Sequence, residues 1–358
     1  MRRFWRMTVM CLVVGLGLGY AFSCSSPTKP KEPKGLRLYV NEGWTNNIYV
    51  FDPETKTLSD SMYSDYAIGI ILSPDGEYLF TTHDAPPAPG RQVLKKIRTK
   101  DFEIVGEMDG IGAMNWLEGG EILLRRRSRV IDYIDPVSLN VERSDSIAFR
   151  ELAAADTLGF VIGTGVGSDW RLIMYNFRNK QIIAADSIYI PNGALAYGLN
   201  LAMSRNGDRG FGIFRDSYQG SWFLEFTIPG FDVQTAFQLA YPYGEIAISP
   251  DNRYVLFSDP GDPWHGSALH KFAVYDAAQQ QIIHVIDTDT LTLLQYFPDA
   301  LIASITFSPH GSIAFMSCGN NGATGPILYF DMKKFEFTDE LHVDFGWCPG
   351  TITVGYKP

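Results

Sequence analysis

A short pattern of an apolar run, a tight turn and a second apolar run recurs along the chain. It reads IILSPDGEYLF at residues 70–80, IAISPDNRYVLF at 246–257 and ITFSPHGSIAF at 305–315. Proline presets the first position of a turn, and Asp-Gly supplies a side-chain cap and a permissive backbone. Each copy therefore predicts two antiparallel strands joined by a tight turn. Weaker relatives lie at residues 113–124, 151–162 and 200–214.

The six copies are spaced by about 40 to 60 residues, which is the period of a propeller blade. A second element follows them, in which an aromatic or β-branched run stops at an acidic or turn-forming residue before another short strand. Clear examples occur at residues 48–57, 133–140, 273–281 and 328–336. We interpret this element as the turn between the third and fourth strands of a blade.

The two ends of the chain complement each other. The element at residues 48–57 has the strand LRLYV before it but no copy of the first pattern, whereas GTITVGYKP at 350–358 is an apolar strand without a partner. A propeller closes when its C-terminal strand completes the N-terminal blade, because no sheet edge then stays open. The sequence therefore predicts an all-β fold, a seven-bladed β-propeller spanning residues 36–358. An aromatic content of 13% and 34 glycines suit many short strands and turns.

Residues 38–57, LYVNEGWTNNIYVFDPETKT, together with the SPDG-like turns, resemble the YVTN-type repeat of seven-bladed β-propellers. That family includes lactonase-like and amine-dehydrogenase-like domains. The resemblance implies the architecture of residues 36–358. It implies no particular chemistry, because propeller repeats encode blade packing and one fold hosts many functions.

The first 23 residues predict a signal peptide, since three arginines precede an uncharged apolar run and then small residues. Cys24 follows Ala21-Phe22-Ser23, which resembles a bacterial lipobox without its usual leucine. We expect Cys24 to be lipidated, with residues 24–35 as a Ser/Pro/Lys tether; simple secretion is the alternative. The protein is accordingly expected in the cell envelope, outside the cytoplasm, anchored to a membrane or else secreted or periplasmic.

Charge and cysteine content narrow the class of partner. Removal of the signal peptide takes away three arginines and leaves 27 basic against 40 acidic residues, a net charge of −13. This sign argues against a nucleic-acid partner. Cys318 and Cys348 then remain in the folded part. An oxidising compartment permits a disulfide between them, and two buried free thiols are the alternative.

The strand order places the loops between second and third strands on one face, which we call the loop face. They span residues 41–47, 82–92, 125–129, 163–170, 215–222, 258–267 and 317–326. Three of their tryptophans, Trp44, Trp222 and Trp264, are candidate contacts to a protein or sugar, or else pack onto the next blade. Arg126 and Arg129, from the cluster RRRSR, could bind an anionic ligand or form ordinary ion pairs.

Catalytic signals are weak. His83, Asp84, Asp259 and His265 could act as acid, base or metal ligands at the channel mouth, although their spacing matches no metal motif. A Gly/Asp-rich loop could hold Ca²⁺, and no other cofactor is expected. The sequence contains no G-x-S-x-G elbow, haem-attachment CxxCH, HExxH, P-loop or dinucleotide-binding motif.

These observations favour a monomeric, non-catalytic scaffold that binds an envelope protein or small extracellular ligand through its loop face. The rival is a lactonase-like or dehydrogenase-like propeller enzyme with its site at the channel mouth. A third possibility is a structural or assembly factor without a small ligand. Converging carboxylates in the mouth would favour the enzyme, and an aromatic rim would favour a partner protein.

Overall fold

The computed structural model describes residues 35–42, 47–64, 67–84, 92–110, 112–117, 120–127, 130–146, 151–154, 159–164, 171–176, 181–187, 196–216, 221–239, 245–259, 271–287, 301–319, 325–341 and 349–356. The chain divides into two units, Met1–Lys31 and Glu32–Pro358, and all described residues lie in the second. Every labelled element of this part is a β-strand. Within it, no helix is long and apolar enough to cross a membrane.

The strands of the described residues form seven four-stranded sheets. In sheet order they are β28 (Pro349–Tyr356), β1 (Leu36–Glu42), β2 (Asn47–Asp52), β3 (Thr57–Tyr63); β4 (Ala67–Leu72), β5 (Tyr78–Asp84), β6 (Gln92–Arg98), β7 (Ile104–Asp109); β8 (Ala113–Leu117), β9 (Ile122–Arg127), β10 (Val130–Ile134), β11 (Val141–Ser146); β12 (Glu151–Ala154), β13 (Gly159–Thr164), β14 (Arg171–Asn176), β15 (Gln181–Asp186); β16 (Ala196–Met203), β17 (Arg209–Asp216), β18 (Ser221–Thr227), β19 (Val233–Leu239); β20 (Ile246–Ile248), β21 (Tyr254–Asp259), β22 (Lys271–Asp276), β23 (Gln281–Asp287); and β24 (Leu301–Phe307), β25 (Ile313–Gly319), β26 (Ile327–Asp331), β27 (Glu336–Leu341).

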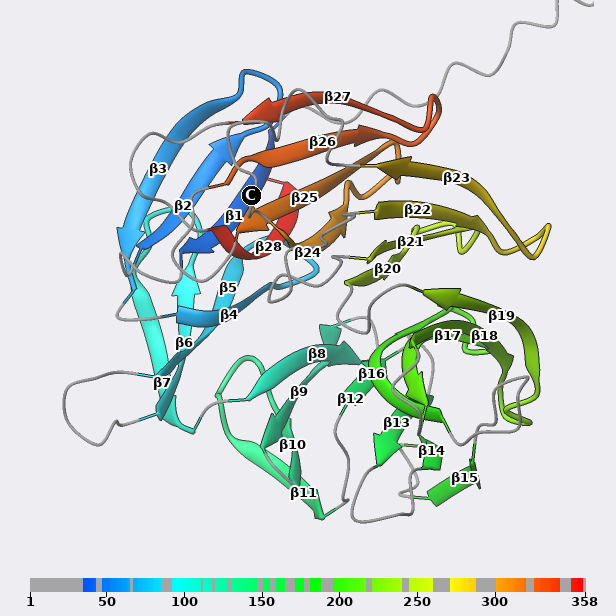
Figure 1. Cartoon of the computed structure of the whole chain (residues 1–358). Coiled ribbons are helices and arrows are strands. Elements are labelled where there is room, and N and C mark those ends of the chain that lie inside the picture. Colours follow the sequence, from blue (N-terminus) through cyan, green and yellow to red (C-terminus); the bar gives the residue numbers. More distant parts are fainter. Residues whose placement is uncertain are drawn as a thin grey trace, which may run out of the picture. The chain divides into compact units, whose positions relative to one another are not determined.

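Six sheets consist of four consecutive antiparallel strands, whereas the seventh combines both ends of the described chain (Figure 1). In that sheet β28 pairs antiparallel with β1, with Leu36 opposite Tyr356 and Val40 opposite Ile352. The predicted pairing of the C-terminal strand with the N-terminal sheet is therefore present. Each first strand also contacts the first strand of the next sheet, in the series β28, β4, β8, β12, β16, β20, β24 and again β28.

Burial follows the position of a strand in its sheet. Most third strands are rich in apolar residues, as in KFAVYD of β22, in which five of the six residues are buried. The fourth strands, such as β3 and β7, alternate or are exposed. A middle strand is covered on both faces by neighbouring sheets, so both of its faces select apolar residues. Aromatic rings fill the space between sheets: Phe223 of β18 stacks on Phe257 of β21 with ring centroids 4.6 Å apart.

The recurrent turn has a structural reason. In β4–β5 the hydroxyl of Ser73 donates to Asp75 Oδ1 at 2.5 Å and accepts the Tyr78 amide at 2.9 Å. Ser249 makes the same two contacts in β20–β21. Gly76 has a φ of 77°, and a Cβ there would lie 2.7 Å from the carbonyl oxygen of Tyr356 on the adjacent sheet. The repeated residues thus close the turn and allow close packing of sheets.

Candidate functional site

The described part of the loop face joins three neighbouring sheets through buried polar side chains. Asn41, at the end of β1, is 3% exposed, and its Nδ2 donates to the carbonyl oxygen of Ala67 at 2.9 Å. Ala67 begins β4 and pairs with His83 of β5. On the other side, the Ser317 hydroxyl of β25 donates to the carbonyl oxygen of Gly350 at 2.6 Å. We call Asn41, Glu42, Thr81, His83 and Ser317 the mouth cluster.

Gly350 of β28 packs closely against the side-chain amide of Asn41. A Cβ at Gly350 would lie 2.7 Å from Oδ1 of Asn41, so a larger residue would push the amide away. The Oδ1 atom of Asn41 has no hydrogen-bond partner within the described residues. Buried amide oxygens usually accept a hydrogen bond, so Oδ1 of Asn41 is an unsatisfied acceptor of the mouth cluster.

Two titratable side chains of the mouth cluster are fully buried. Glu42, the last residue of β1, lies opposite Pro349 of β28 and has an exposed fraction of 0%. His83 of β5 is equally buried, and its Nε2 is hydrogen-bonded to the hydroxyl of Thr81. Sequence reasoning selected His83 but expected it in an open loop, whereas β5 continues to Asp84 and holds the imidazole inside. It missed Asn41 and Glu42, which follow the apolar run LYV as a polar pair.

The first three arginines of the cluster belong to a strand rather than to a loop. β9 extends to Arg127, and its Arg125 is only 2% exposed. The Arg125 guanidinium makes hydrogen bonds to Asp132 Oδ2, of 2.7 Å from Nη2 and 3.1 Å from Nε. Its Nη1 donates to the carbonyl oxygens of Asp109 and Gly110 on the neighbouring sheet, at 2.6 and 3.1 Å. Arg125 therefore forms an ion pair within its own sheet and backbone hydrogen bonds to the next sheet, and the side chains of Arg126 and Arg129 lie outside the described residues.

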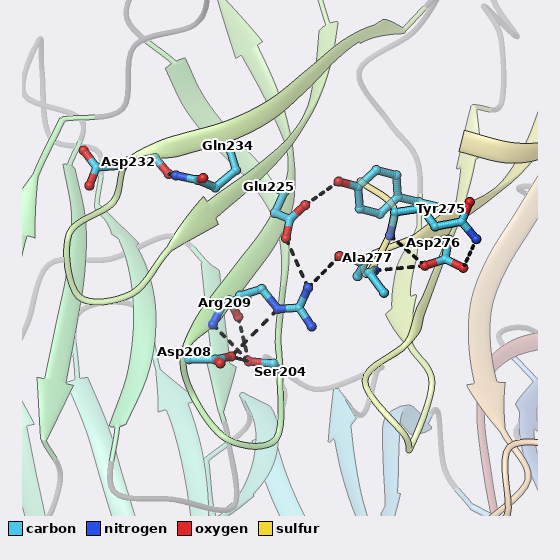
Figure 2. Close-up of polar contacts among 11 residues, drawn as sticks. Ser204, Asp208, Arg209, Glu225, Asp232, Gln234, Tyr275, Asp276 and Ala277 are labelled. Carbon is cyan, nitrogen blue, oxygen red and sulfur yellow. Dashed lines mark hydrogen bonds and ion pairs between the residues drawn. The ribbon is translucent and has the colours of Figure 1, made fainter. Parts of the chain in front are cut away.

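A second buried charge connects the β16–β19 and β20–β23 sheets. Figure 2 shows the Glu225 carboxylate between the Arg209 guanidinium and the Tyr275 hydroxyl. Glu225 and Tyr275 are both 0% exposed, and Arg209 Nη1 also donates to the carbonyl oxygen of Ala277 at 2.8 Å. Burial, and next the hydrogen bond to Glu225, raise the pKa of Tyr275 well above its ordinary value of 10. Such a network orients two sheets relative to each other.

The remaining candidates are only partly covered by the structure. Trp222 lies in β18, not in a loop, and packs half-buried against the core cluster that contains Phe214 and Leu224. Cys318 is fully buried and has no disulfide partner among the described residues, and burial raises the pKa of its thiol well above the ordinary value. Cys348 lies outside the described residues, so the disulfide stays a prediction.

Cys24, Trp44, Trp264 and His265 lie outside the described residues, as do the side chains of Asp84 and Asp259. Among the described residues, no group of three or more His, Cys, Asp or Glu side chains is arranged to hold a metal ion.

Comparison with known proteins adds the fold. No protein-family model and no curated protein matches the sequence. Among solved structures, a functionally unknown protein of Desulfotomaculum acetoxidans has a TM-score of 0.64 at 12% identity, over 90% of this chain and 99% of that one. The β-propeller domain of Myceliophteria thermophila Cps50 (Swd1) has a TM-score of 0.60 at 9% identity, over 82% and 91%.

A third similar structure is the dihydro-heme d1 dehydrogenase NirN in complex with DHE, with a TM-score of 0.56 at 13% identity, over 88% of this chain and 74% of that one. Identities this low establish the fold alone. The chain is an all-β β-propeller.

Proposed function

We propose that this protein is an extracytoplasmic, lipid-anchored β-propeller of the YVTN type that binds an envelope protein or small ligand through its loop face, without catalysis and as a monomer. The apolar N-terminal segment, Cys24 and the Ser/Pro/Lys tether support the location and anchor. The repeated SPDG-like turns support the family assignment.

We also propose that the seven sheets are the blades of one closed ring. The contacts of one strand, β28, support the closure of this ring. β28 pairs with β1, and the same strand contacts both β24 and β4, the first strands of the sheets on either side. In a closed ring every blade packs against two neighbours, which favours a rigid support for loops.

The single observation that carries the binding function is the polar connection across the loop face. The hydrogen bonds of Ser317 to Gly350 and of Asn41 to Ala67 fix the ends of three sheets relative to one another. Loops that leave such fixed ends lose little conformational entropy when they bind, so the interface gains affinity through preorganisation.

In-cell photo-crosslinking tests this proposal. A photoreactive amino acid is introduced singly into the full-length protein on the loop face, at Trp44, Arg126, Arg129 or Trp264. Matched control positions are Gln279 and Lys333, which are exposed in turns between third and fourth strands, on the opposite face. We expect one envelope protein to crosslink repeatedly at the loop-face positions and not at the controls. Equal crosslinking from both faces, or no recurrent partner, would contradict the proposal.

A second candidate function rests on the two buried titratable groups of the mouth cluster. Glu42 and His83 occupy neighbouring sheets at the loop face, where a carboxylate and an imidazole could serve as acid and base. We test this rival by screening lactones and oxidisable small molecules against the purified protein. Turnover that disappears in both Glu42→Gln and His83→Gln, with the variants still folded, would favour the enzyme over the scaffold.

A further inference from the structure

A separate pocket of about 220 Å³ lies between the β4–β7 and β8–β11 sheets, beside the turn at Ser73–Gly76. This turn connects first and second strands, so the pocket opens on the face opposite the loop face. Its walls include Asp75, Tyr78, Phe80, Lys96, Trp116 and Val137. It is smaller than the ~300–1,000 Å³ typical of drug-sized ligand sites, so it suits a small molecule or a single side chain.

Lys96 of β6 lies in the wall of this pocket and is only 6% exposed, which is unusual for a lysine. Its Nζ lies 4.0 Å from the centroid of the Tyr78 ring and donates to the carbonyl oxygen of Val137 at 3.3 Å. Within the described residues, Lys96 has no ion pair and no other hydrogen bond. An ammonium group has three donors, and buried lysines are almost always paired. The pocket therefore holds a cation with unused donor capacity.

The nearby carboxylates are already committed to turns. The Asp75 carboxylate accepts hydrogen bonds from the hydroxyl of Ser73 and the amide of Glu77. The Asp135 carboxylate accepts hydrogen bonds from the amide of Val137 and the hydroxyl of Ser138. Burial lowers the pKa of Lys96, while the charges of Asp135 and then Asp75 oppose that shift. These carboxylates stabilise the ammonium from a distance and leave its donors available.

The other walls are apolar and flat. Trp116 packs edge-to-face on Phe80, with ring centroids 5.3 Å apart and an interplanar angle of 81°. The Trp116 Nε1 already donates to the carbonyl oxygen of Leu72 at 2.7 Å, so the indole offers the pocket only apolar surface. Val137, at the rim, has an apolar side chain that is 80% exposed. A ligand with a flat apolar body would cover this surface while its charged end reaches Lys96.

We propose that this pocket binds a small aromatic monocarboxylate, with the carboxylate on Nζ of Lys96 and the ring against Trp116 and Val137. Two sources carry this chemistry: a free arylalkyl acid, or the C-terminal carboxylate of a peptide that ends in an aromatic residue. The site is on the opposite face from the proposed partner surface, so this proposal does not depend on the proposed binding function.

Titration calorimetry of the purified chain with phenylacetate tests the site. We expect saturable binding that weakens at least tenfold when 2-phenylethanol or 2-phenylethylamine replaces the acid, because neither offers an anion to the ammonium. This comparison requires no mutation. An N-acetyl dipeptide that ends in phenylalanine distinguishes the sources: at least tenfold tighter binding than phenylacetate indicates a peptide end, and equal or weaker binding a free acid.

Variants then locate the site. Lys96→Met and Lys96→Gln should each weaken phenylacetate binding at least tenfold, whereas Lys100→Gln, the same charge change at an exposed turn residue, should change it less than twofold. Lys96→Gln covers the case in which Lys96→Met does not fold. Absence of phenylacetate binding, binding equal to that of the alcohol, or unchanged binding in a folded Lys96 variant would overturn the proposal.

Discussion

Tyr275→Phe isolates the hydrogen bond that links two sheets in Figure 2. The substitution removes one hydroxyl, which donates to Oε2 of Glu225 where both residues are 0% exposed. A hydrogen bond to a charged group contributes about 1.5–3 kcal/mol. The remaining partner, Arg209 Nη1, is 3.4 Å from the other carboxylate oxygen and does not compensate. We therefore expect the free energy of unfolding to fall by about 2 kcal/mol, a large share of the 5–15 kcal/mol typical of folded proteins.

Tyr254→Phe is the matched control. Tyr254 is the first residue of β21 in the same sheet as Tyr275, and its hydroxyl makes no hydrogen bond within the described part of the chain. Urea unfolding followed by tryptophan fluorescence should place this variant within about 0.5 kcal/mol of the wild type. Combining Tyr275→Phe with Glu225→Gln should show a coupling energy of about 0.5–3 kcal/mol. Equal losses for the two tyrosine variants, or strict additivity with Glu225→Gln, would refute the reasoning.

Three further outcomes are expected. Asp132→Ala should lower the free energy of unfolding by about 3–5 kcal/mol in the same urea assay, because it leaves the buried Arg125 unpaired. Asp101→Ala, which breaks an exposed ion pair, is the control and should change this free energy little. Burial, and then the hydrogen bond to Asp145, raise the pKa of Tyr175 to about 12, so this tyrosine ionises in the unfolded chain first. The free energy of unfolding should therefore fall above pH 10 by about 1.4 kcal/mol per pH unit per such tyrosine. A free energy of unfolding that does not change from pH 9 to 11 would contradict this. Burial lowers the pKa of Lys96 from 10.5, so the unfolded chain binds this proton more tightly than the folded chain does. The wild type should therefore gain stability relative to Lys96→Met as the pH rises toward 10.5. A loss of stability over that pH range would exclude a desolvated ammonium.

The sequence predicted most of the architecture because its signals are local. The turn at Ser73–Gly76 connects β4 and β5, and the element at residues 48–57 contains the turn between β2 and β3, as expected. The lone strand at the C-terminus pairs with β1. Strand ends were less accurate: β5 and β18 include His83 and Trp222, which we expected in loops. Strands continue as long as a neighbouring strand offers hydrogen bonds, and that length is not encoded in the residue types alone.

The candidate site was harder to predict, because charge runs have the same sequence appearance on a surface and in an interior. Arg125 begins a run of arginines that resembles a solvated patch, yet its guanidinium is buried against Asp132 and two backbone carbonyls. Lys96 follows another lysine in β6, and only one of the two faces a pocket with aromatic walls. Strand alternation assigns such residues to faces, but the partner across the gap comes from a different sheet.

The sequence by itself determined the β-propeller, because each repeat carries its own turn residues and apolar strands, and a unit of this size buries its apolar faces only against neighbours like itself. Tertiary structure alone decided which polar side chains meet. Glu225 with Tyr275, Asn41 with Ala67 and Lys96 with the Val137 carbonyl each join different sheets, over 26 to 50 residues of sequence. Such contacts depend on the packing distance and register between sheets, which arise only when the whole fold has formed.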